Sequence, residues 1–272
     1  MREVVLITGV SSGTGLGLAT RFADEGYRVA GSVRTREQAA ELQSILGDHF
    51  MPLIFDVTDP DQVASAARQL KQQYKVEHLA AIVNNAGSAK MGPLLHVSVD
   101  EFREHLDVLV VGQLSVIQNF FGFLLPGDAK AEPGKIFNIT SVSGVRPNYL
   151  FGCYAAGKHA FEGLSKTLRQ ECAMYGVKVI VIAPGNIATE IWGKQTEEMI
   201  GKYRSTDYFD GLGVKLNTIS TDVVRQAMSV EEFSSAFYGI FTDSSPADRY
   251  TIVKSRNRKI PLSKAKVRIL RL

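Results

Sequence analysis

The chain has 272 residues, of which 45% are hydrophobic and 22% are charged, and its formal net charge is +3. This composition is typical of a soluble globular protein and excludes a disordered chain, because enough apolar surface is present to offset the entropy of folding. The weak charge gives no support to nucleic-acid binding, and no apolar run approaches the roughly 20 residues of a transmembrane helix. The two cysteines, Cys153 and Cys172, predict reduced and buried thiols. With no signal peptide visible, a cytoplasmic location is expected.

Strand and helix signals alternate along most of the chain. Short apolar runs predict strands that are buried on both faces, and they are separated by runs with helical spacing. The predicted strands are Val4–Ile7, Tyr27–Val33, Met51–Phe55, Leu79–Val83, Lys135–Thr140, Val177–Ala183 and Arg249–Val253. The predicted helices cover residues 16–26, 36–46, 60–74, 98–125 and 152–175, and a short one begins at the capping box of Ser229.

This alternation predicts an α/β fold: a Rossmann-like, doubly wound parallel sheet of about seven strands in a single domain over residues 1–253. Residues 186–220 show no clear periodicity. Residues 254–272 contain eight Lys or Arg and no acidic residue. They are predicted to be a basic tail, either solvated or in weak contact with an anionic surface.

A glycine-rich turn, residues 8–15 (TGVSSGTG), joins the first predicted strand to the first predicted helix. Glycines allow backbone N–H groups to approach a pyrophosphate, and the N-terminus of the following helix favours its negative charge. The spacing is T-G-x-x-x-G-x-G and differs from the G-x-G-x-x-G of most dinucleotide folds. The turn therefore predicts nucleotide binding.

Three further motifs follow in order, each at the end of a predicted strand or on the helix after it. They are residues 84–87 (NNAG), a Y-x-x-x-K from Tyr154 to Lys158 with Ser141 thirteen residues before it, and Pro184-Gly185 with Thr189. With the glycine-rich turn, they resemble the short-chain dehydrogenase/reductase family, most of all members acting on steroids, retinoids and related hydrophobic alcohols. The resemblance is strong over about residues 3–190.

The resemblance implies an oxidoreductase in which Ser141, Tyr154 and Lys158 are catalytic, with Ser143 as a rival to Ser141. Tyr154 would be the general acid or base, and Lys158 would also contact the nicotinamide ribose. No metal is implied. The cofactor-binding residues that follow from the motifs and the resemblance are Gly9, Ser11, Ser12, Gly13, Thr14, Gly15, Arg34, Asp56, Val57, Asn84, Ala86, Gly87, Tyr154, Lys158, Pro184, Gly185, Ile187 and Thr189.

The residues after the second predicted strand predict NADP(H) rather than NAD(H). An NAD site usually has Asp or Glu there to bind the adenine ribose hydroxyls, and Val33 cannot do so. Arg34 can pair with a 2′-phosphate, although a solvated Arg is the alternative. By resemblance, Asp56 and Val57 would contact the adenine; Asp56 could otherwise be a turn residue with Thr58.

Lys158 lies four residues after Tyr154, so a helix would place both on one face. A nearby ammonium stabilises a phenolate, so we expect the pKa of Tyr154 to be lowered. One position departs from the family: Leu109 stands where the family has an Asn that helps to hold a water near the catalytic Lys. A weakly active NADP(H)-binding sensor is therefore an alternative function.

The region after Thr189 is rich in aromatic and aliphatic residues, which suits an apolar substrate. The expected function is thus the interconversion of a hydrophobic secondary alcohol and its ketone. A 3-ketoacyl-thioester reductase is the alternative within the same class. The family is usually oligomeric, so a homodimer or homotetramer is expected. The resemblance implies that residues 188–220 form a lid over the substrate, and ordinary packing of a peripheral helix pair is the alternative. The apolar residues expected in this lid are Ile191, Trp192, Met199, Ile200, Tyr203, Tyr208, Phe209 and Leu212.

Overall fold

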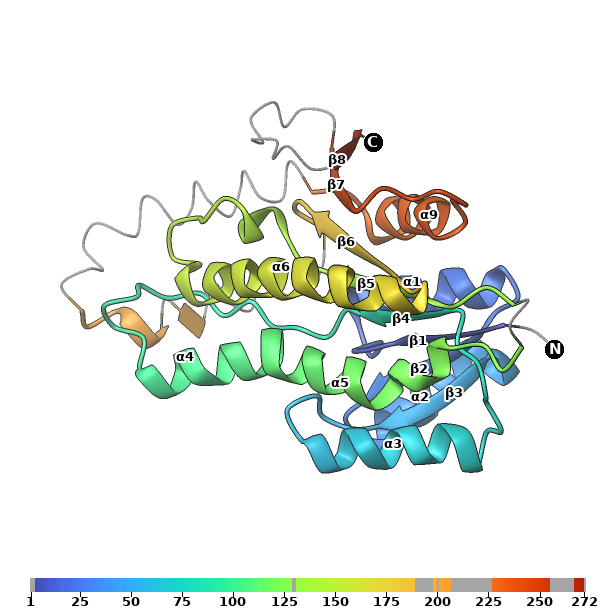
Figure 1. Ribbon diagram of the computed structural model, residues 1–272. Coiled ribbons are helices and arrows are strands. Elements are labelled where there is room, and N and C mark those ends of the chain that lie inside the picture. The colour runs from blue at the N-terminus through green and yellow to red at the C-terminus, as the bar shows by residue number, and fades with distance from the viewer. Residues whose placement is uncertain are drawn as a thin grey trace.

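The protein folds around one parallel sheet of eight strands in the order β3-β2-β1-β4-β5-β6-β7-β8 (Figure 1). The structure is a computed structural model, and it describes residues 3–128, 131–188, 198–199, 201–206, 227–254 and 267–271. The strands are β1 Val4–Ile7, β2 Arg28–Val33, β3 Phe50–Ile54, β4 Ala81–Asn84, β5 Lys135–Ile139, β6 Lys178–Pro184, β7 Arg249–Val253 and β8 Val267–Arg271. The predicted Rossmann-like α/β fold is confirmed.

Helices cover both faces of the sheet (Figure 1). Because side chains alternate along a strand, Val5 and Ile7 of β1 face one helical layer, whereas Val4 and Leu6 face the other. This is why the strands read as continuous apolar runs. The first layer contains α1 Gly13–Asp24, α2 Arg36–Leu46 and α9 Val230–Phe241. The second contains α3 Pro60–Gln72, α4 Val99–Leu106, α5 Gly112–Phe120 and α6 Gly152–Cys172.

The helix starts follow local sequence rules. Asp59 accepts hydrogen bonds from the first backbone amides of α3, and Pro60 occupies the first turn. The capping boxes predicted at Ser98 and Ser229 are both formed, each with a glutamate three residues later. Local capping residues thus determine where these helices begin.

The helix predicted over residues 98–125 is interrupted. A π-helical turn, η2 Asp107–Val111, separates α4 from α5, and the N–H of Gly112 bonds to the carbonyl of Asp107, five residues back. Gly112 lies against the loop after β3, where a Cβ would come within 2.7 Å of the Val57 carbonyl oxygen. A π-helical turn shifts the helical pattern by only one residue, and in an apolar run such as 108–111 this shift does not stand out; such turns are frequent at functional sites.

The helical run Val99–Leu124 is long and apolar enough to cross a membrane by length and composition alone, contrary to the expectation from the sequence. Helices packed inside a fold meet the same criterion. Here the run packs against α3 and α6 in the layer that covers the sheet, so the membrane interpretation has little support from its surroundings.

The basic tail predicted after residue 253 contributes a strand. Val267–Arg271 forms β8 and pairs in parallel with β7, with Val267 opposite Arg249 and Arg271 opposite Val253. These five residues therefore form an edge strand of the sheet, which the sequence did not predict. The sheet gains one strand over the expected seven.

Candidate functional site

A cavity of about 1100 Å³ lies at the carboxyl ends of the strands. It opens where the strand order reverses between β1 and β4, which is the usual ligand site of open α/β sheets. The residues singled out in the sequence that line it are Gly9, Ser11, Ser12, Gly13, Thr14, Arg34, Asp56, Val57, Ala86, Gly87, Ser141, Tyr154, Lys158, Pro184, Gly185 and Ile187. Gly15 and Asn84 do not line it, and Thr189 lies outside the described residues.

The glycine-rich turn at one end of the cavity is held by hydrogen bonds from its neighbours. Gly9 has a φ of 69°, and its N–H donates to the Ser32 hydroxyl at 2.8 Å. The Asn85 amide donates to the Thr8 carbonyl at 2.9 Å and accepts from the Thr14 hydroxyl at 2.9 Å. Ser12, the N-cap of α1, makes no side-chain hydrogen bond to the first turn. The amides at this helix start are therefore available to an anion.

Gly15 and Asn84 do not line the cavity, but each holds neighbouring elements of the site together. A Cβ on Gly15 would overlap the carbonyl of Gly9, so only glycine lets α1 approach the turn this closely. The Asn84 amide donates to Asn138 on β5 at 2.8 Å, and Asn138 donates to Ser165 on α6 at 2.8 Å. Asn84 thus ties β4 to β5 beneath the cavity.

Ser141, Tyr154 and Lys158 come together at the other end of the cavity. Ser141 follows β5, and its buried hydroxyl accepts the N–H of Ser143 at 3.1 Å. Burial raises the pKa of Tyr154, and a hydrogen bond with Ser141 opposes that rise. Ser143 also lines the cavity, and its hydroxyl accepts a hydrogen bond from the Asn148 amide at 3.5 Å.

Lys158 is buried and turned toward the sheet. Its Nζ donates to the carbonyl of Ile139 at 2.7 Å and lies 5.7 Å from the centre of the Tyr154 ring. Burial lowers the pKa of Lys158 to about 8, and the charge of Glu162 opposes this. The expectation that Lys158 lowers the pKa of Tyr154 is not met: the pKa is raised, because burial outweighs the other influences on the phenol.

Leu109, the position at which the family resemblance led us to expect an Asn, lies inside η2 and is completely buried. A Cβ on Gly157 would lie 2.8 Å from its Cδ1, and a Cβ on Gly87 would lie 3.2 Å from its Cδ2 and 3.9 Å from Lys158 Nζ. An apolar side chain thus occupies the space between the cavity wall and α6, close to the Lys158 amine. Its hydrocarbon side chain cannot hold a water molecule near the Lys158 amine.

At the far end of the cavity, Arg34 is exposed. Its backbone N–H donates to Gln38 at 3.0 Å, and its guanidinium has no ion pair with any described residue. Asp56 accepts hydrogen bonds from the backbone N–H and hydroxyl of Thr58, at 2.9 and 2.7 Å. Asp56 therefore forms the turn with Thr58 that the sequence analysis gave as an alternative to adenine binding. It also lines the cavity.

Several residues of the site were not singled out in the sequence. Ser32 holds the glycine-rich turn, and the buried Gln113 donates to the Ala86 carbonyl at 2.8 Å and to Val108 at 2.9 Å. Neither lies in a motif, because each acts across a contact between elements that are distant in sequence.

The part of the lid region that the structure describes packs beside the catalytic end. Met199 and Tyr203 are buried in a small apolar cluster with Phe151, and Tyr154 packs against this cluster. Lys202 forms an ion pair with Glu101 on α4. The other residues expected in the lid, Ile191, Trp192, Ile200, Tyr208, Phe209 and Leu212, lie outside the described residues.

Residues 3–200 match the family model of the short chain dehydrogenases, so the chain belongs to the short-chain dehydrogenase/reductase family and is an oxidoreductase. It is 33% identical to an NADPH-dependent 3-dehydrocapnine reductase of Ornithobacterium rhinotracheale, over 94% of this chain and 89% of that protein. Retinol dehydrogenase 7 of Rattus norvegicus is 32% identical, over 81% of this chain and 73% of the relative. A short-chain dehydrogenase structure from Streptomyces avermitilis has a TM-score of 0.74 at 24% identity, over 92% of this chain and 88% of that one.

Proposed function

We propose that the protein is an NADP(H)-dependent oxidoreductase that interconverts a hydrophobic secondary alcohol and its ketone. The observation that carries this proposal is the single cavity that joins an anion-binding turn to the group of Ser141, Tyr154 and Lys158. The similarity to an NADPH-dependent reductase and to a retinol dehydrogenase supports both the cofactor and an apolar substrate.

The residues that line the cavity fit a dinucleotide. The uncapped start of α1, at Gly13 and Thr14, would hold the pyrophosphate, and Arg34 would pair with a 2′-phosphate. Asp56 and Val57 would border the adenine. Lys158 and the turn after β6, at Pro184, would border the nicotinamide end. When bound, the cofactor supplies or accepts the hydride.

The protein supplies the proton. In the reducing direction, the Tyr154 hydroxyl would donate its proton to the carbonyl oxygen while Ser141 holds that oxygen by a hydrogen bond. The raised pKa of Tyr154 keeps the phenol protonated at neutral pH, which suits a general acid. The Lys158 ammonium would stabilise the phenolate left behind, and its pKa of about 8 means that it is charged in the neutral range.

An apolar substrate fits the wall beside Tyr154. Met91, Phe151, Met199 and Tyr203 are buried together there, and Tyr154 packs against them. A substrate with aliphatic or ring carbons next to its carbonyl would extend this cluster and remove further apolar surface from water.

The test is a screen of steroid, retinoid and aliphatic ketones with NADPH, followed by Tyr154→Phe. We expect this substitution to reduce turnover by at least about 100-fold, the low end of an acid–base contribution, and to change NADPH affinity only a few-fold. Tyr175→Phe is the matched control, because Tyr175 is half-exposed, packs on Phe121 and does not line the cavity. Full turnover in Tyr154→Phe would show that another group is the acid. Turnover of a short acetoacetyl thioester alone would favour a 3-ketoacyl reductase.

A further inference from the structure

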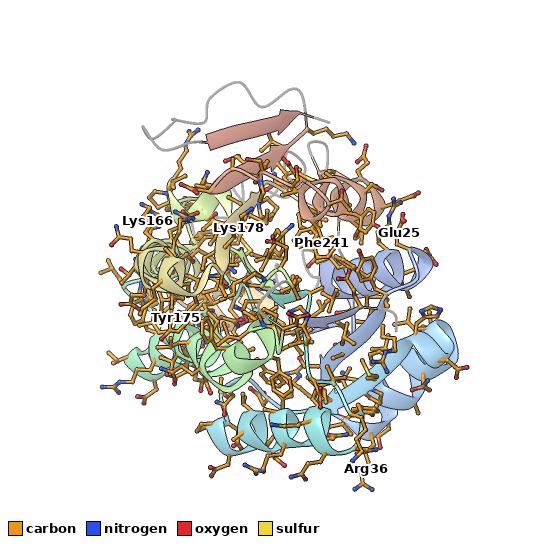
Figure 2. The ribbon with its side chains drawn as sticks, turned by 45° about the vertical axis from the view of Figure 1, so that its right-hand side comes forward. Glu25, Arg36, Lys166, Tyr175, Lys178 and Phe241 are labelled. Atoms are coloured by element: carbon orange, nitrogen blue, oxygen red, sulfur yellow. The ribbon has the colours of Figure 1, made fainter. Side chains whose placement is uncertain are left out.

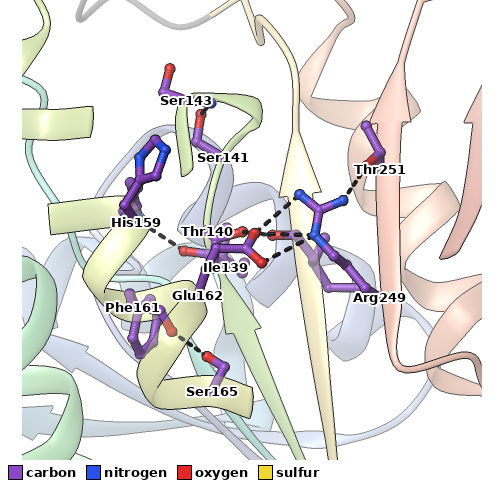
Figure 3. Close-up of polar contacts among 12 residues, drawn as sticks. Ile139, Thr140, Ser141, Ser143, His159, Phe161, Glu162, Ser165, Arg249 and Thr251 are labelled. Carbon is purple, nitrogen blue, oxygen red and sulfur yellow. Dashed lines mark hydrogen bonds and ion pairs between the residues drawn. The ribbon is translucent and has the colours of Figure 1, made fainter. Parts of the chain in front are cut away.

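Four polar residues form a buried cluster behind the catalytic end of the cavity (Figure 3). Arg249 on β7 reaches across to Glu162 on α6: its Nε lies 3.2 Å from Oε1 and 3.1 Å from Oε2, and its Nη2 lies 3.1 Å from Oε1. The Thr140 hydroxyl donates to Glu162 Oε1 at 2.8 Å. Arg249 Nη1 donates to the Thr251 hydroxyl at 2.6 Å.

The pair is almost entirely removed from water, since Glu162 is 3% exposed and Arg249 is 8% exposed. Burying two charges carries a large desolvation cost, which a pair recovers only with good geometry and further hydrogen bonds. Such a pair is weak evidence for added stability. Its position relative to the catalytic residues is more informative.

Glu162 is related to the Lys158 side chain in two ways. It lies four residues after Lys158 on α6, so the two side chains share one face of the helix. Through Thr140, it also holds the end of β5, where Ile139 provides the carbonyl that accepts Lys158 Nζ and where Ser141 follows. The carboxylate is thus one helical turn from Lys158 and is bonded to Thr140, the residue between the acceptor of the amine, Ile139, and the serine, Ser141.

The charges around Lys158 are unbalanced without Glu162. On α6 itself Lys158 is near the neutral Tyr154, and the nearby charge on β7 is the cation of Arg249. The elements α4 and η2, which also pack on α6, contribute the buried His105, Glu104 of the cavity wall and the exposed Asp107. Burial lowers the pKa of Lys158, and Glu162 is the charged group that raises it.

We propose that Glu162 is a positioning residue for the reaction: held by Arg249 and Thr140, its carboxylate stabilises the buried Lys158 ammonium and fixes the Ile139–Ser141 end of β5. Arg249 holds the carboxylate in place. The inference rests on the proposed role of Lys158 in catalysis.

The test measures the titration of Lys158 directly. In protein labelled with ¹³C at lysine Cε, the Lys158 signal is assigned by its loss in Lys158→Met and followed by NMR from pH 6 to 11. In Glu162→Gln we expect the midpoint to fall by at least about one pH unit, because an adjacent opposite charge is lost. Glu162→Asp keeps the charge and should remain close to the wild type.

Two further variants keep the test decisive. Glu162→Gln leaves Arg249 buried without a counter-charge and could fail to fold. In that case Glu162→Gln/Arg249→Met removes both charges, and the Lys158 midpoint should still lie below that of the wild type. Asp100→Asn is the matched control, because it removes a carboxylate from an exposed pair with Arg103, and it should leave the midpoint unchanged.

The pH dependence of ketone reduction separates this inference from the proposed function. If Lys158 acts in turnover, the alkaline limb of the profile in Glu162→Gln should move to lower pH together with the NMR midpoint. If the midpoint moves and the profile does not, Glu162 acts on Lys158 as proposed, and the role of Lys158 in turnover is wrong. An unchanged midpoint in folded Glu162→Gln, or in the folded double variant, overturns the inference.

Discussion

Arg34 directly follows β2 and lines the cavity, and we propose that it binds the 2′-phosphate of NADP(H). Its guanidinium has no ion pair with a described residue, so it is available to a 2′-phosphate at the edge of the cavity. We expect Arg34→Ala to weaken NADPH binding by roughly 10- to 100-fold, because a hydrogen-bonded charge pair contributes about 1.5–3 kcal/mol. NADH binding should change little. Fluorescence titration with both cofactors measures this.

The control for Arg34 is Arg36→Ala, which removes an exposed cation at the start of α2 that does not line the cavity. It should leave the ratio of NADPH to NADH affinity unchanged. If Arg34→Ala weakens the affinity for NADPH and for NADH equally, Arg34 supports the turn and does not select the 2′-phosphate.

The low pKa of Lys158 has a consequence for stability. The folded state has a pKa of about 8, against an ordinary 10.5, so between these values the unfolded chain binds more protons and stability rises with pH. Below pH 8, the buried ammonium costs the fold roughly 3 kcal/mol, at about 1.36 kcal/mol per pH unit. Lys158→Met should therefore be more stable than the wild type at pH 7, and the difference should shrink toward pH 10.

Urea unfolding of both proteins at intervals from pH 7 to 10 tests this. The raised pKa of Tyr154 affects stability only above about pH 10, where this tyrosine ionises in the unfolded chain before it does so in the folded protein, which favours unfolding. The comparison therefore stays below that pH. A stability difference that is constant over this range would mean that Lys158 is not buried as an ammonium.

Individual residues of the site were predictable where they belong to a local motif. The spacing of Tyr154, Lys158 and Ser141 depends on one helix and one strand end, and the structure places all three on one cavity. Glu162 and Arg249 are 87 residues apart, and nothing in their spacing indicates that they meet. The direction in which the Tyr154 pKa shifts could not be predicted from the sequence either, because burial of the phenol depends on the packing of the whole fold.

Among the elements, η2 and α6 are in close contact near the site. Gly157 on α6 faces Leu109, and a Cβ there would lie 2.8 Å from Cδ1 and 3.0 Å from Cβ of that leucine. Gly163, two turns later on the same helix, has open space around it. Two glycines of one helix thus have opposite roles, and the sequence does not distinguish them.

We expect Gly157→Ala to lower stability by about 1–3 kcal/mol, because the added methyl overpacks a contact with fully buried Leu109. Turnover should fall as well, since Leu109 and Lys158 adjoin the same wall. Gly163→Ala, the matched control, should instead stabilise the protein by about 0.5–1 kcal/mol through helix propensity. Chemical denaturation of both variants measures the two signs. If Gly157→Ala and Gly163→Ala both stabilise the protein, η2 can shift away from α6 at little cost and Gly157 is not required for this contact.

For the whole molecule, the alternation of strands and helices was sufficient to predict the sheet, because each apolar strand must be covered on both faces. It was insufficient for β8. Residues 267–271 (VRILR) read as part of a basic tail, and charged residues such as Arg268 and Arg271 are also what an edge strand uses to discourage further pairing. Whether such a segment pairs depends on the exposed edge of β7, which only the assembled sheet provides.

β8 protects the edge of β7, the strand that carries Arg249 of the buried cluster. We expect a chain that ends at Lys266 to lose this cover, so that β7 becomes an unpaired edge and a template for aggregation. Its Tm should fall by roughly 3–10 °C, since a loss of about 1 kcal/mol lowers Tm by about 2–4 °C at this size. A chain that ends at Arg271 keeps β8 and is the control. Thermal unfolding with light scattering measures both effects, and an unchanged Tm in the shorter chain would mean that β8 adds no support to β7 in solution.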